Sequence, residues 1–352
     1  MPPDDRSTST PVFVLTGFLG SGKTTLLSKL IAHDGMRDTM VLMNELGEIA
    51  LDHLIVKEIT DEVVLLRSGC LCCAVRDDLT ETLINLHHRR AAGDLPDFGR
   101  IVIETTGFAD PTPILLTLMS DDWIVRHYSS VGIITTVDAT HGGAQLQRHD
   151  EAMRQVALAD SLVVTKTDLA MPAQIDMLAQ QLAALNPGAG IVQSELEGCP
   201  SLDALFTDQR PHLQKNLVSL PRKYGFLNRT PDDAPSGEVR YIAHRHGGCI
   251  NTFCVVADEA LDWSAFTDWL NLLLINRGDR ILRVKGLVGV TDHSEPILVQ
   301  GVQHVFYPPI RLQAWPTDDR RSRLVFITDG LGAEAIAASF SRFQKNVRVA
   351  LV

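Results

Sequence analysis

The segment Gly17 to Thr25, with the sequence GFLGSGKTT, constrains the fold more than any other part of the chain. It fits the pattern G-x-x-x-x-G-K-[ST] through Gly17, Gly22, Lys23 and Thr24. An apolar run precedes it and a helix-forming segment follows it, which is the strand, loop and helix setting that the pattern requires. The segment therefore predicts a phosphate-binding loop at the end of a buried strand.

Each residue type in this loop has a physical reason to be there. The glycines allow the backbone to curl so that successive N–H groups point at phosphate oxygens, and the next helix adds its dipole. Lys23 is expected to bridge the β- and γ-phosphates, and the Thr24 hydroxyl to ligate Mg²⁺. A glycine turn without a ligand is the alternative, but it gives no packing reason for a Lys-Thr pair after the last glycine. The predicted nucleotide-binding residues here are Gly17, Gly20, Ser21, Gly22, Lys23, Thr24 and Thr25.

Length and composition exclude several classes of protein. The 352 residues are too many for one typical domain and suit two, and with 45% hydrophobic and 21% charged residues the chain is globular rather than disordered. A net charge of −11 argues against binding of nucleic acid, which selects for basic surfaces. The N-terminus lacks the basic and apolar regions of a secretion signal, and the apolar stretches are too short to span a membrane. We expect a cytoplasmic protein with no membrane partner.

The texture of the sequence changes along the chain. Up to residue 193, short apolar runs alternate with helical segments, which predicts an α/β domain with a doubly wound, mostly parallel sheet. Beyond it, prolines fall among charged residues, as in a linker. Strand-like segments at 241–246, 250–257, 281–290, 297–306 and 323–328 and helical segments at 263–276 and 333–343 then predict a smaller α+β domain, an antiparallel sheet with helices on one face. We assign residues 1–207 to the P-loop domain, 208–237 to the linker and 238–352 to the C-terminal domain.

A carboxylate and a glycine follow another predicted strand. Glu104 ends an apolar run, and Gly107 comes three residues later. Because ligands collect at the carboxyl ends of parallel strands, Glu104 is placed to hold Mg²⁺ through water, and the Gly107 N–H to meet the γ-phosphate. A strand-end glutamate that only serves solubility is the alternative.

The sequence Thr165-Lys166-Thr167-Asp168 follows the apolar run at 161–164, where a base-recognition loop is expected. Asp168 can accept hydrogen bonds from guanine N1–H and N2–H₂, whereas adenine offers an acceptor at N1. The stem of Lys166 can lie across the purine face. The pattern favours GTP over ATP, and a solvated Lys-Asp turn is the alternative.

Six cysteines are too few for a disulfide scaffold, and three of them, Cys70, Cys72 and Cys73, lie within four positions. They follow the predicted strand at 63–66, so they should emerge at the same sheet edge as the phosphates. Three thiolates can converge on a soft divalent ion such as Zn²⁺, with a fourth position left to another ligand or water, and such an open site suits metal transfer. Buried cysteines that act as small hydrophobic residues, or a redox pair, are the alternatives.

Two glutamates, Glu45 and Glu48, lie where nucleotide-sensing switch loops are found. Either is placed to orient the attacking water or to reach the cysteine site, and surface carboxylates are the alternative. We take Lys23, Glu45 and Glu104 as the catalytic set. Two weaker metal candidates are a cluster formed by His244, His246 and Cys249, and His304 acting across the domain boundary.

With these residues placed, the chain resembles the CobW-type family of metal-handling GTPases, relatives of the urease and hydrogenase maturation GTPases. The motifs GFLGSGKTT, NELGE, GCLCC, ETTG and TKTD occur in order, followed by KGLVGV and QGVQHVF in the second domain. The resemblance implies low-rate GTP hydrolysis coupled to binding of Zn²⁺ or Co²⁺ by the cysteines, with delivery to a client metalloprotein or pathway. By analogy, the stretch at 185–187 flanks the guanine.

The chain departs from the family pattern in two ways. Thr165 stands where the base motif often begins with asparagine, so we expect a lower nucleotide affinity with guanine selectivity retained through Asp168. A His-rich run, which several members carry, does not occur in this sequence. The physiological metal, the client and the oligomeric state, a homo-oligomer included, stay open.

These features combine into one hypothesis. GTP with Mg²⁺ is expected to order the loops at 44–61 and 67–75 together, so that the thiolate site depends on the γ-phosphate and loses metal affinity after hydrolysis. One alternative is a metal buffer or sensor that holds nucleotide without turnover. Another is a small-molecule kinase on the same fold, although the sequence contains no segment that reads as its lid.

Overall fold

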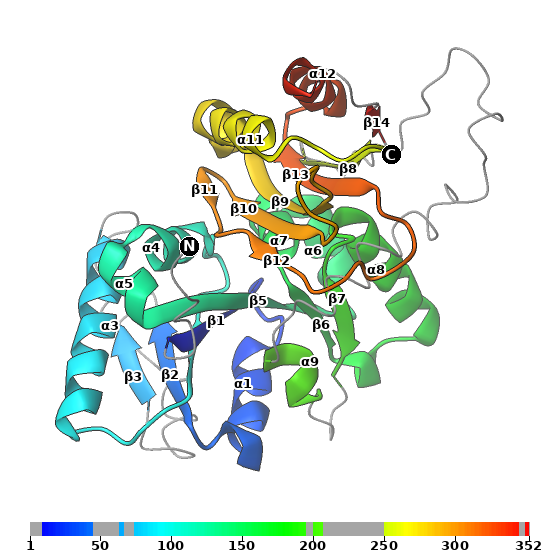
Figure 1. The fold of residues 1–352 in the computed structure, drawn as a ribbon. Coiled ribbons are helices and arrows are strands. Elements are labelled where there is room, and N and C mark those ends of the chain that lie inside the picture. Colours follow the sequence, from blue (N-terminus) through cyan, green and yellow to red (C-terminus); the bar gives the residue numbers. More distant parts are fainter. Residues whose placement is uncertain are drawn as a thin grey trace. The chain divides into compact units, whose positions relative to one another are not determined.

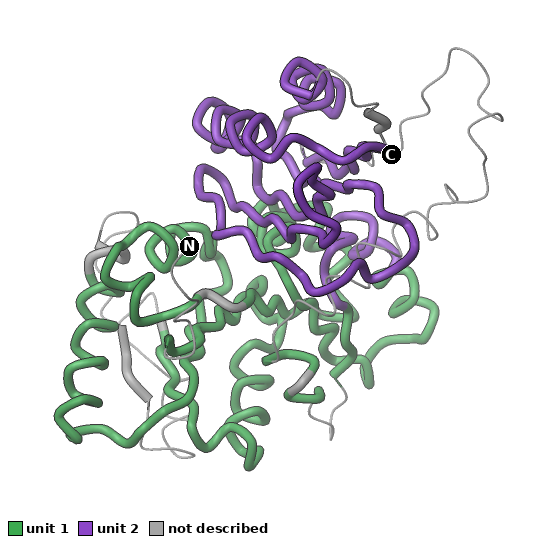
Figure 2. The backbone as a smooth tube through the Cα atoms, in the orientation of Figure 1, with its two compact units in different colours: residues 1–179, 191–209 green, residues 180–190, 210–352 purple. Residues whose placement is uncertain are grey.

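The computed structural model describes residues 9–44, 63–66, 74–194, 200–206, 250–344 and 349–351. They belong to two compact units, residues 1–179 with 191–209 and residues 180–190 with 210–352 (Figure 2). The predicted linker and the predicted strand at 241–246 lie outside the described residues. Among the described residues, no helix is long and apolar enough to cross a membrane.

The first unit is built around a seven-stranded sheet with the order β3-β2-β4-β1-β5-β6-β7 (Figure 1). The pairs β1–β4, β1–β5, β2–β3, β2–β4 and β5–β6 run parallel, as helical crossovers require. The predicted doubly wound α/β fold is therefore confirmed. The strands are β1 (Thr10–Gly17), β2 (Thr39–Asn44), β3 (Val63–Leu66), β4 (Arg100–Glu104), β5 (Tyr128–Asp138), β6 (Ser161–Thr165) and β7 (Gly190–Gln193).

Helices cover both faces of this sheet. Phe13 and Leu15 of β1 pack with α1 and α9 on one face, while the alternate residues Val12 and Val14 are buried on the other. The helices are α1 (Lys23–Ile31), α3 (Ala74–Ala92), α4 (Thr112–Ser120), α5 (Asp122–His127), α6 (Gly142–Arg148), α7 (Asp150–Leu158), α8 (Pro172–Leu185) and α9 (Leu202–Phe206), with short 3₁₀ turns at Asp34–Met36 and Thr167–Leu169.

The strand register brings several polar residues to one edge of the sheet. Gly17 pairs with Thr136, and Leu15 with Glu104, so the strands on both sides of β1 end beside the P-loop. Asp138 at the end of β5 pairs with Thr165 at the end of β6. The four central strands thus direct their carboxyl ends, where α/β proteins bind ligands, toward a common region.

The second unit contains a seven-stranded sheet with the order β11-β10-β9-β13-β8-β14, with β12 paired to β10. Every strand pair described here runs antiparallel. The strands are β8 (Ile250–Ala257), β9 (Ile281–Val288), β10 (Ile297–Val302), β11 (Val305–Phe306), β12 (Ile310–Arg311), β13 (Ser322–Asp329) and β14 (Val349–Leu351), and the helices are α11 (Trp263–Arg277), α12 (Ala333–Phe343) and the 3₁₀ turn Gly278–Arg280.

The core of this unit lies between the sheet and its two helices. Trp269 of α11 meets Phe340 of α12 edge to face, with ring centroids 4.7 Å apart, and also contacts Phe326 of β13. Its indole Nε1 donates to Ser339 Oγ at 2.9 Å, so the buried polar atom is satisfied. The predicted α+β domain, an antiparallel sheet with helices on one face, is confirmed.

The prediction of one strand over residues 297–306 was wrong. The segment forms two antiparallel strands, β10 and β11, in which Val302 pairs with Val305. Gln303 makes the tight turn between them with a left-handed φ of 48°. Apolar residues on both sides of the Gln-His pair imitate a continuous strand, so hydrophobic periodicity did not reveal the turn.

Candidate nucleotide site

The P-loop has the backbone shape that its glycines predict. Gly17, Gly20 and Gly22 have φ values of 147°, 74° and 87°, which L-residues rarely adopt. At Gly17 a Cβ atom would lie 2.5 Å from the Thr136 carbonyl oxygen and closer still to the Thr136 hydroxyl. Gly17 therefore permits both the turn and the close approach of β5.

The side chain of Lys23 curls back into the loop that precedes it. Its Nζ donates to the carbonyl oxygens of Gly17 at 2.9 Å and of Phe18 at 3.3 Å, and the residue is buried. On the same loop, Ser21 Oγ lies 2.6 Å from Thr136 Oγ1. A largely buried ammonium at a glycine-rich turn that begins a helix is the arrangement that suits a phosphate chain.

Thr24 and Glu104, the two predicted magnesium ligands, lie side by side. Thr24 Oγ1 donates to Glu104 Oε1 at 2.8 Å, and Glu104 is buried at the end of β4. The next residue is fixed to β1, because Thr105 N donates to Leu15 O at 2.9 Å. A hydroxyl and a carboxylate side by side are hard oxygen ligands, so this pair fits Mg²⁺.

Gly107 lies directly against the first half of the P-loop. A Cβ atom at this position would stand 2.7 Å from Leu19 Cα and 2.8 Å from Leu19 N. This contact leaves no room for a larger residue. The loop that follows β4 and the P-loop are therefore in backbone contact.

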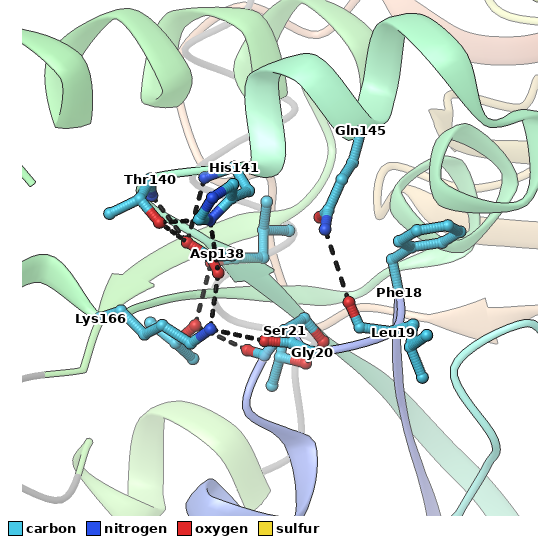
Figure 3. Close-up of polar contacts among 12 residues, drawn as sticks. Phe18, Leu19, Gly20, Ser21, Asp138, Thr140, His141, Gln145 and Lys166 are labelled. Atoms are coloured by element: carbon cyan, nitrogen blue, oxygen red, sulfur yellow. Dashed lines mark hydrogen bonds and ion pairs between the residues drawn. The ribbon is translucent and has the colours of Figure 1, made fainter. Parts of the chain in front are cut away.

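The base-recognition loop is tied to the P-loop by two side chains (Figure 3). Thr165 Oγ1 donates to Ser21 O at 2.6 Å, so this residue, which stands where the family often has asparagine, holds the two loops together. Lys166 Nζ donates to Gly20 O and to Asp138 Oδ2, both at 2.7 Å. Lys166 also has a left-handed φ of 55°, and Asp168 lies exposed in the following 3₁₀ turn.

Asp138 is a component of this site that the sequence analysis missed. It is 2% exposed and accepts hydrogen bonds from Lys166, from Thr140 N and Oγ1, and from His141 N. Burial alone raises the pKa of Asp138, but the bonds from Lys166 and Thr140 outweigh it and lower this pKa to about 2. The ionised carboxylate fixes the position of Lys166. The strand-end rule that identified Glu104 applies equally to Asp138.

The structure describes only part of the predicted set. It brings together the P-loop residues, Glu104, Gly107, Thr165 and Lys166, with Asp168 in the turn that follows. Lying outside the described residues are Glu45, Glu48, Cys70, Cys72, Cys73, His244, His246 and Cys249.

No metal cluster replaces the predicted cysteine site within the part of the chain that the structure describes. There, no three His, Cys, Asp or Glu side chains are grouped so that they could hold a metal ion. In the second unit, His304 Nδ1 lies 2.8 Å from Leu274 O in α11. Cys254 is buried, and burial raises the pKa of its thiol to about 12, which suits an inert residue.

Comparison with known proteins identifies both units. The CobW/HypB/UreG nucleotide-binding domain matches residues 11–193, and the cobalamin synthesis protein cobW C-terminal domain matches residues 250–344. The chain is 31% identical over 334 residues to the zinc chaperone YjiA of Escherichia coli, covering 95% of this chain and 98% of that protein. It is 28% identical over 354 residues to the zinc chaperone CobW of Sinorhizobium sp, covering 90% and 92%.

Solved structures give the same answer. Zinc-bound YjiA GTPase from E. coli matches with a TM-score of 0.68 at 27% identity, covering 96% of this chain and 99% of that one. A zinc-bound triple mutant of YjiA, with a glutamate and two cysteines changed to alanine, matches with a TM-score of 0.70 at the same identity and coverage. The chain therefore belongs to the CobW/HypB/UreG family, and residues 11–193 are its nucleotide-binding domain.

Proposed function

We propose that this chain is a GTPase that couples nucleotide hydrolysis to the handling of a divalent metal, zinc in the first place, and delivers it to a client metalloprotein. The observation that carries the proposal is the convergence of Lys23, the Thr24–Glu104 pair and the Lys166 loop at one sheet edge. Relatives named zinc chaperones and a zinc-regulated GTPase metalloprotein activator support the metal-handling part.

Different residues of the site are assigned to the phosphates and to Mg²⁺. The P-loop N–H groups and Lys23 receive the β- and γ-phosphates, and Thr24 and Glu104 are the residues that would hold Mg²⁺. When bound, this ion supplies charge neutralisation on the phosphates. Glu45, the residue after β2, is assigned to orienting the attacking water, since the catalytic set needs a base or water-positioning group.

Guanine recognition follows from the way Lys166 is held. Its Nζ is fixed by Gly20 O and Asp138, so the position of its aliphatic stem is restricted, and we assign this stem as the platform for the purine face. Asp168, two residues on, is left exposed to accept from guanine N1–H and N2–H₂. Adenine presents an acceptor at N1 and leaves this carboxylate unsatisfied, so GTP is the substrate that fits.

The cargo metal is assigned to Cys70, Cys72 and Cys73. Three thiolates favour Zn²⁺, with Co²⁺ as the second candidate. These cysteines begin four residues after the end of β3, whose carboxyl end lies at the same sheet edge as the P-loop. One zinc-bound YjiA structure carries replacements of two cysteines, so the presence of zinc alone does not identify a site, and a test has to measure affinity and stoichiometry.

The nucleotide part is tested by Lys23→Ala. We expect GTP turnover, measured as phosphate release, to fall by about 100-fold or more, because a positioned charge on the transferring phosphoryl group is lost. Lys29→Ala, on the same helix, is the matched control and should retain turnover. Wild-type protein that binds GTP without turnover would favour the metal buffer or sensor, and a phosphorylated small-molecule acceptor would favour the kinase.

The metal part is tested by Cys72→Ser in the full-length protein. Equilibrium dialysis should show a lower zinc affinity and stoichiometry, with GTP binding nearly unchanged, because a hydroxyl is a much poorer zinc ligand than a thiolate. Cys254→Ala removes a buried thiol of the second unit and serves as the control. Unchanged zinc stoichiometry in Cys72→Ser contradicts the assignment of the site.

A further inference from the structure

Gln155 is a buried polar residue that the proposed mechanism has not used. It lies in α7, is 0% exposed, and its Nε2 donates to Ala109 O at 3.0 Å and to Gly107 O at 3.2 Å. Both partners are carbonyl oxygens, which only accept, so the chemistry itself assigns the amide nitrogen to this side. Gln155 therefore connects α7 to two positions of the loop that follows Glu104.

Helix α7 reaches the same loop by a second route. Phe108 lies edge to face against Phe18 of the P-loop, with ring centroids 5.2 Å apart, and Phe18 stacks on His149 at 4.5 Å. His149 directly precedes α7. Gly107, whose carbonyl accepts from Gln155, is itself in contact with Leu19. Figure 3 shows Phe18 and Leu19 on the P-loop segment that receives these contacts.

A buried amide at this position is costly. Gln155 Oε1 and Thr106 Oγ1 are both buried and have no hydrogen-bond partner among the described residues. Each such atom opposes folding because it has lost its hydrogen bonds to water, whereas an apolar side chain of the same shape would avoid the cost at Gln155. The two bonds that Gln155 donates are the feature that an apolar residue cannot reproduce.

We propose that Gln155 is a positioning residue for recognition of the γ-phosphate. By holding Gly107 O and Ala109 O, it keeps the Gly107 N–H in the place where the terminal phosphate of GTP is expected. GDP lacks this phosphate, so Gln155 contributes to the binding of GTP and not of GDP. The inference rests on the proposed GTPase function and adds to it the residue that makes the site sensitive to nucleotide state.

The first test is Gln155→Met, which keeps the length of the side chain and removes the donor. In the full-length protein we expect the affinity for a non-hydrolysable GTP analogue to fall about tenfold, as the loss of hydrogen bonds worth 1–1.5 kcal/mol requires, while GDP affinity stays within about twofold. Gln147→Met, on the exposed side of α6, is the control and should leave both affinities unchanged. Equal losses for both nucleotides, or no loss for either, overturn the proposal.

A second variant separates positioning from general stability. Gln155→Glu keeps the shape, but its carboxylate donates only when protonated, and burial raises the pKa of such a group toward neutrality. We expect the preference of this variant for the GTP analogue over GDP to recover as the pH falls from about 8 to 6, while that of Gln155→Met does not change with pH. A pH-independent preference in Gln155→Glu contradicts the proposal.

The two proposals fail in different ways. If wild-type protein neither binds nor hydrolyses GTP, the proposed function is wrong and the comparison of variants has no basis. If wild-type protein hydrolyses GTP and prefers the analogue to GDP, but Gln155→Met keeps the same preference, only the role of Gln155 is wrong.

Discussion

Asp138 makes an acid-sensitive contribution to stability. Its pKa in the folded protein is about 2, below the ordinary value of 3.8, so the contribution is fully present above about pH 5 and is lost as the pH falls through 3.8 toward 2. The difference corresponds to roughly 2 kcal/mol of unfolding free energy. Asp138→Asn is therefore expected to flatten the loss of stability between pH 5 and 3, measured by urea unfolding at several pH values.

The control for this prediction is Asp34→Asn. Asp34 pairs with Arg37 in solvent at 2.7 Å, and exposed ion pairs contribute little to stability. The acid dependence of this variant should match that of the wild type. If Asp138→Asn also keeps the wild-type acid dependence, the carboxylate of Asp138 does not stabilise the folded state as an ion.

At the scale of single residues, the sequence predicted those whose type and spacing have one chemical use. Lys23 and Thr24 follow from the glycine pattern, and the structure adds a contact between Thr24 and Glu104 that the pattern did not specify. Gln155 was not predicted because a glutamine in a helix is usually exposed. Its position beside Ala152 and Val156, on the buried face of α7, was the available signal, but only the fold reveals which carbonyls it meets.

At the scale of elements, the turn from β1 into α1 depends on the absence of a side chain at Gly17. Gly17→Ala places a Cβ within 2.5 Å of the backbone of Thr136 in a region of φ that alanine disfavours. We expect the variant to lose nucleotide binding and to unfold at a lower urea concentration. The decrease in the free energy of unfolding should exceed the roughly 1–2 kcal/mol that backbone strain alone costs.

Gly93→Ala separates the effect of a steric clash with Thr136 from the effect of an unfavourable φ angle. Gly93 has a φ of 78°, but a Cβ atom there would have no neighbour within 4 Å. This variant should show a small loss of stability and normal GTP binding. If Gly17→Ala behaves like Gly93→Ala, the approach of β5 does not require a glycine.

The sequence predicted most elements of the two sheets because their apolar runs are distinct. The segments 63–66, 250–257 and 333–343 match the observed elements residue for residue. Three short helices, α5, α6 and α9, were missed. Asp121 begins α5 by accepting from Trp123 N and Ile124 N, a capping contact of a helix with only six residues, which is too short to produce a periodic pattern.

At the scale of the whole molecule, the strand order gives the separation between the strand that leads to the P-loop and the strand that leads to the proposed zinc site. The strand that precedes the cysteines, β3, is separated from β1 by β2 and β4, so it begins three strand spacings, about 14 Å, from the P-loop strand. Zinc and γ-phosphate are therefore not expected to share ligands. Strands β2 and β4 lie between β3 and β1 in the sheet, so we expect the segments that follow these two strands in the sequence to carry any effect of one site on the other.

Thermodynamic linkage makes the proposed coupling between zinc binding and nucleotide binding measurable. If the GTP analogue tightens zinc binding by some factor relative to GDP, zinc must tighten binding of the analogue relative to GDP by the same factor. We expect a factor of about 5 to 150, the usual range of allosteric coupling, from zinc titrations of the protein loaded with each nucleotide. Equal zinc affinities in the two states would show that the sites are independent.

The ties between the P-loop and the base-recognition loop have a consequence for synthesis on the ribosome. Ser21 is bound by Thr165 across 144 positions of sequence, and Gly20 by Lys166 across 146. A nascent chain in which residue 166 is still inside the ribosome therefore lacks both contacts, although its glycine loop has already left the ribosome. The phosphate pocket is therefore translated well before the side chains that close it, which follow 144 and 146 positions later.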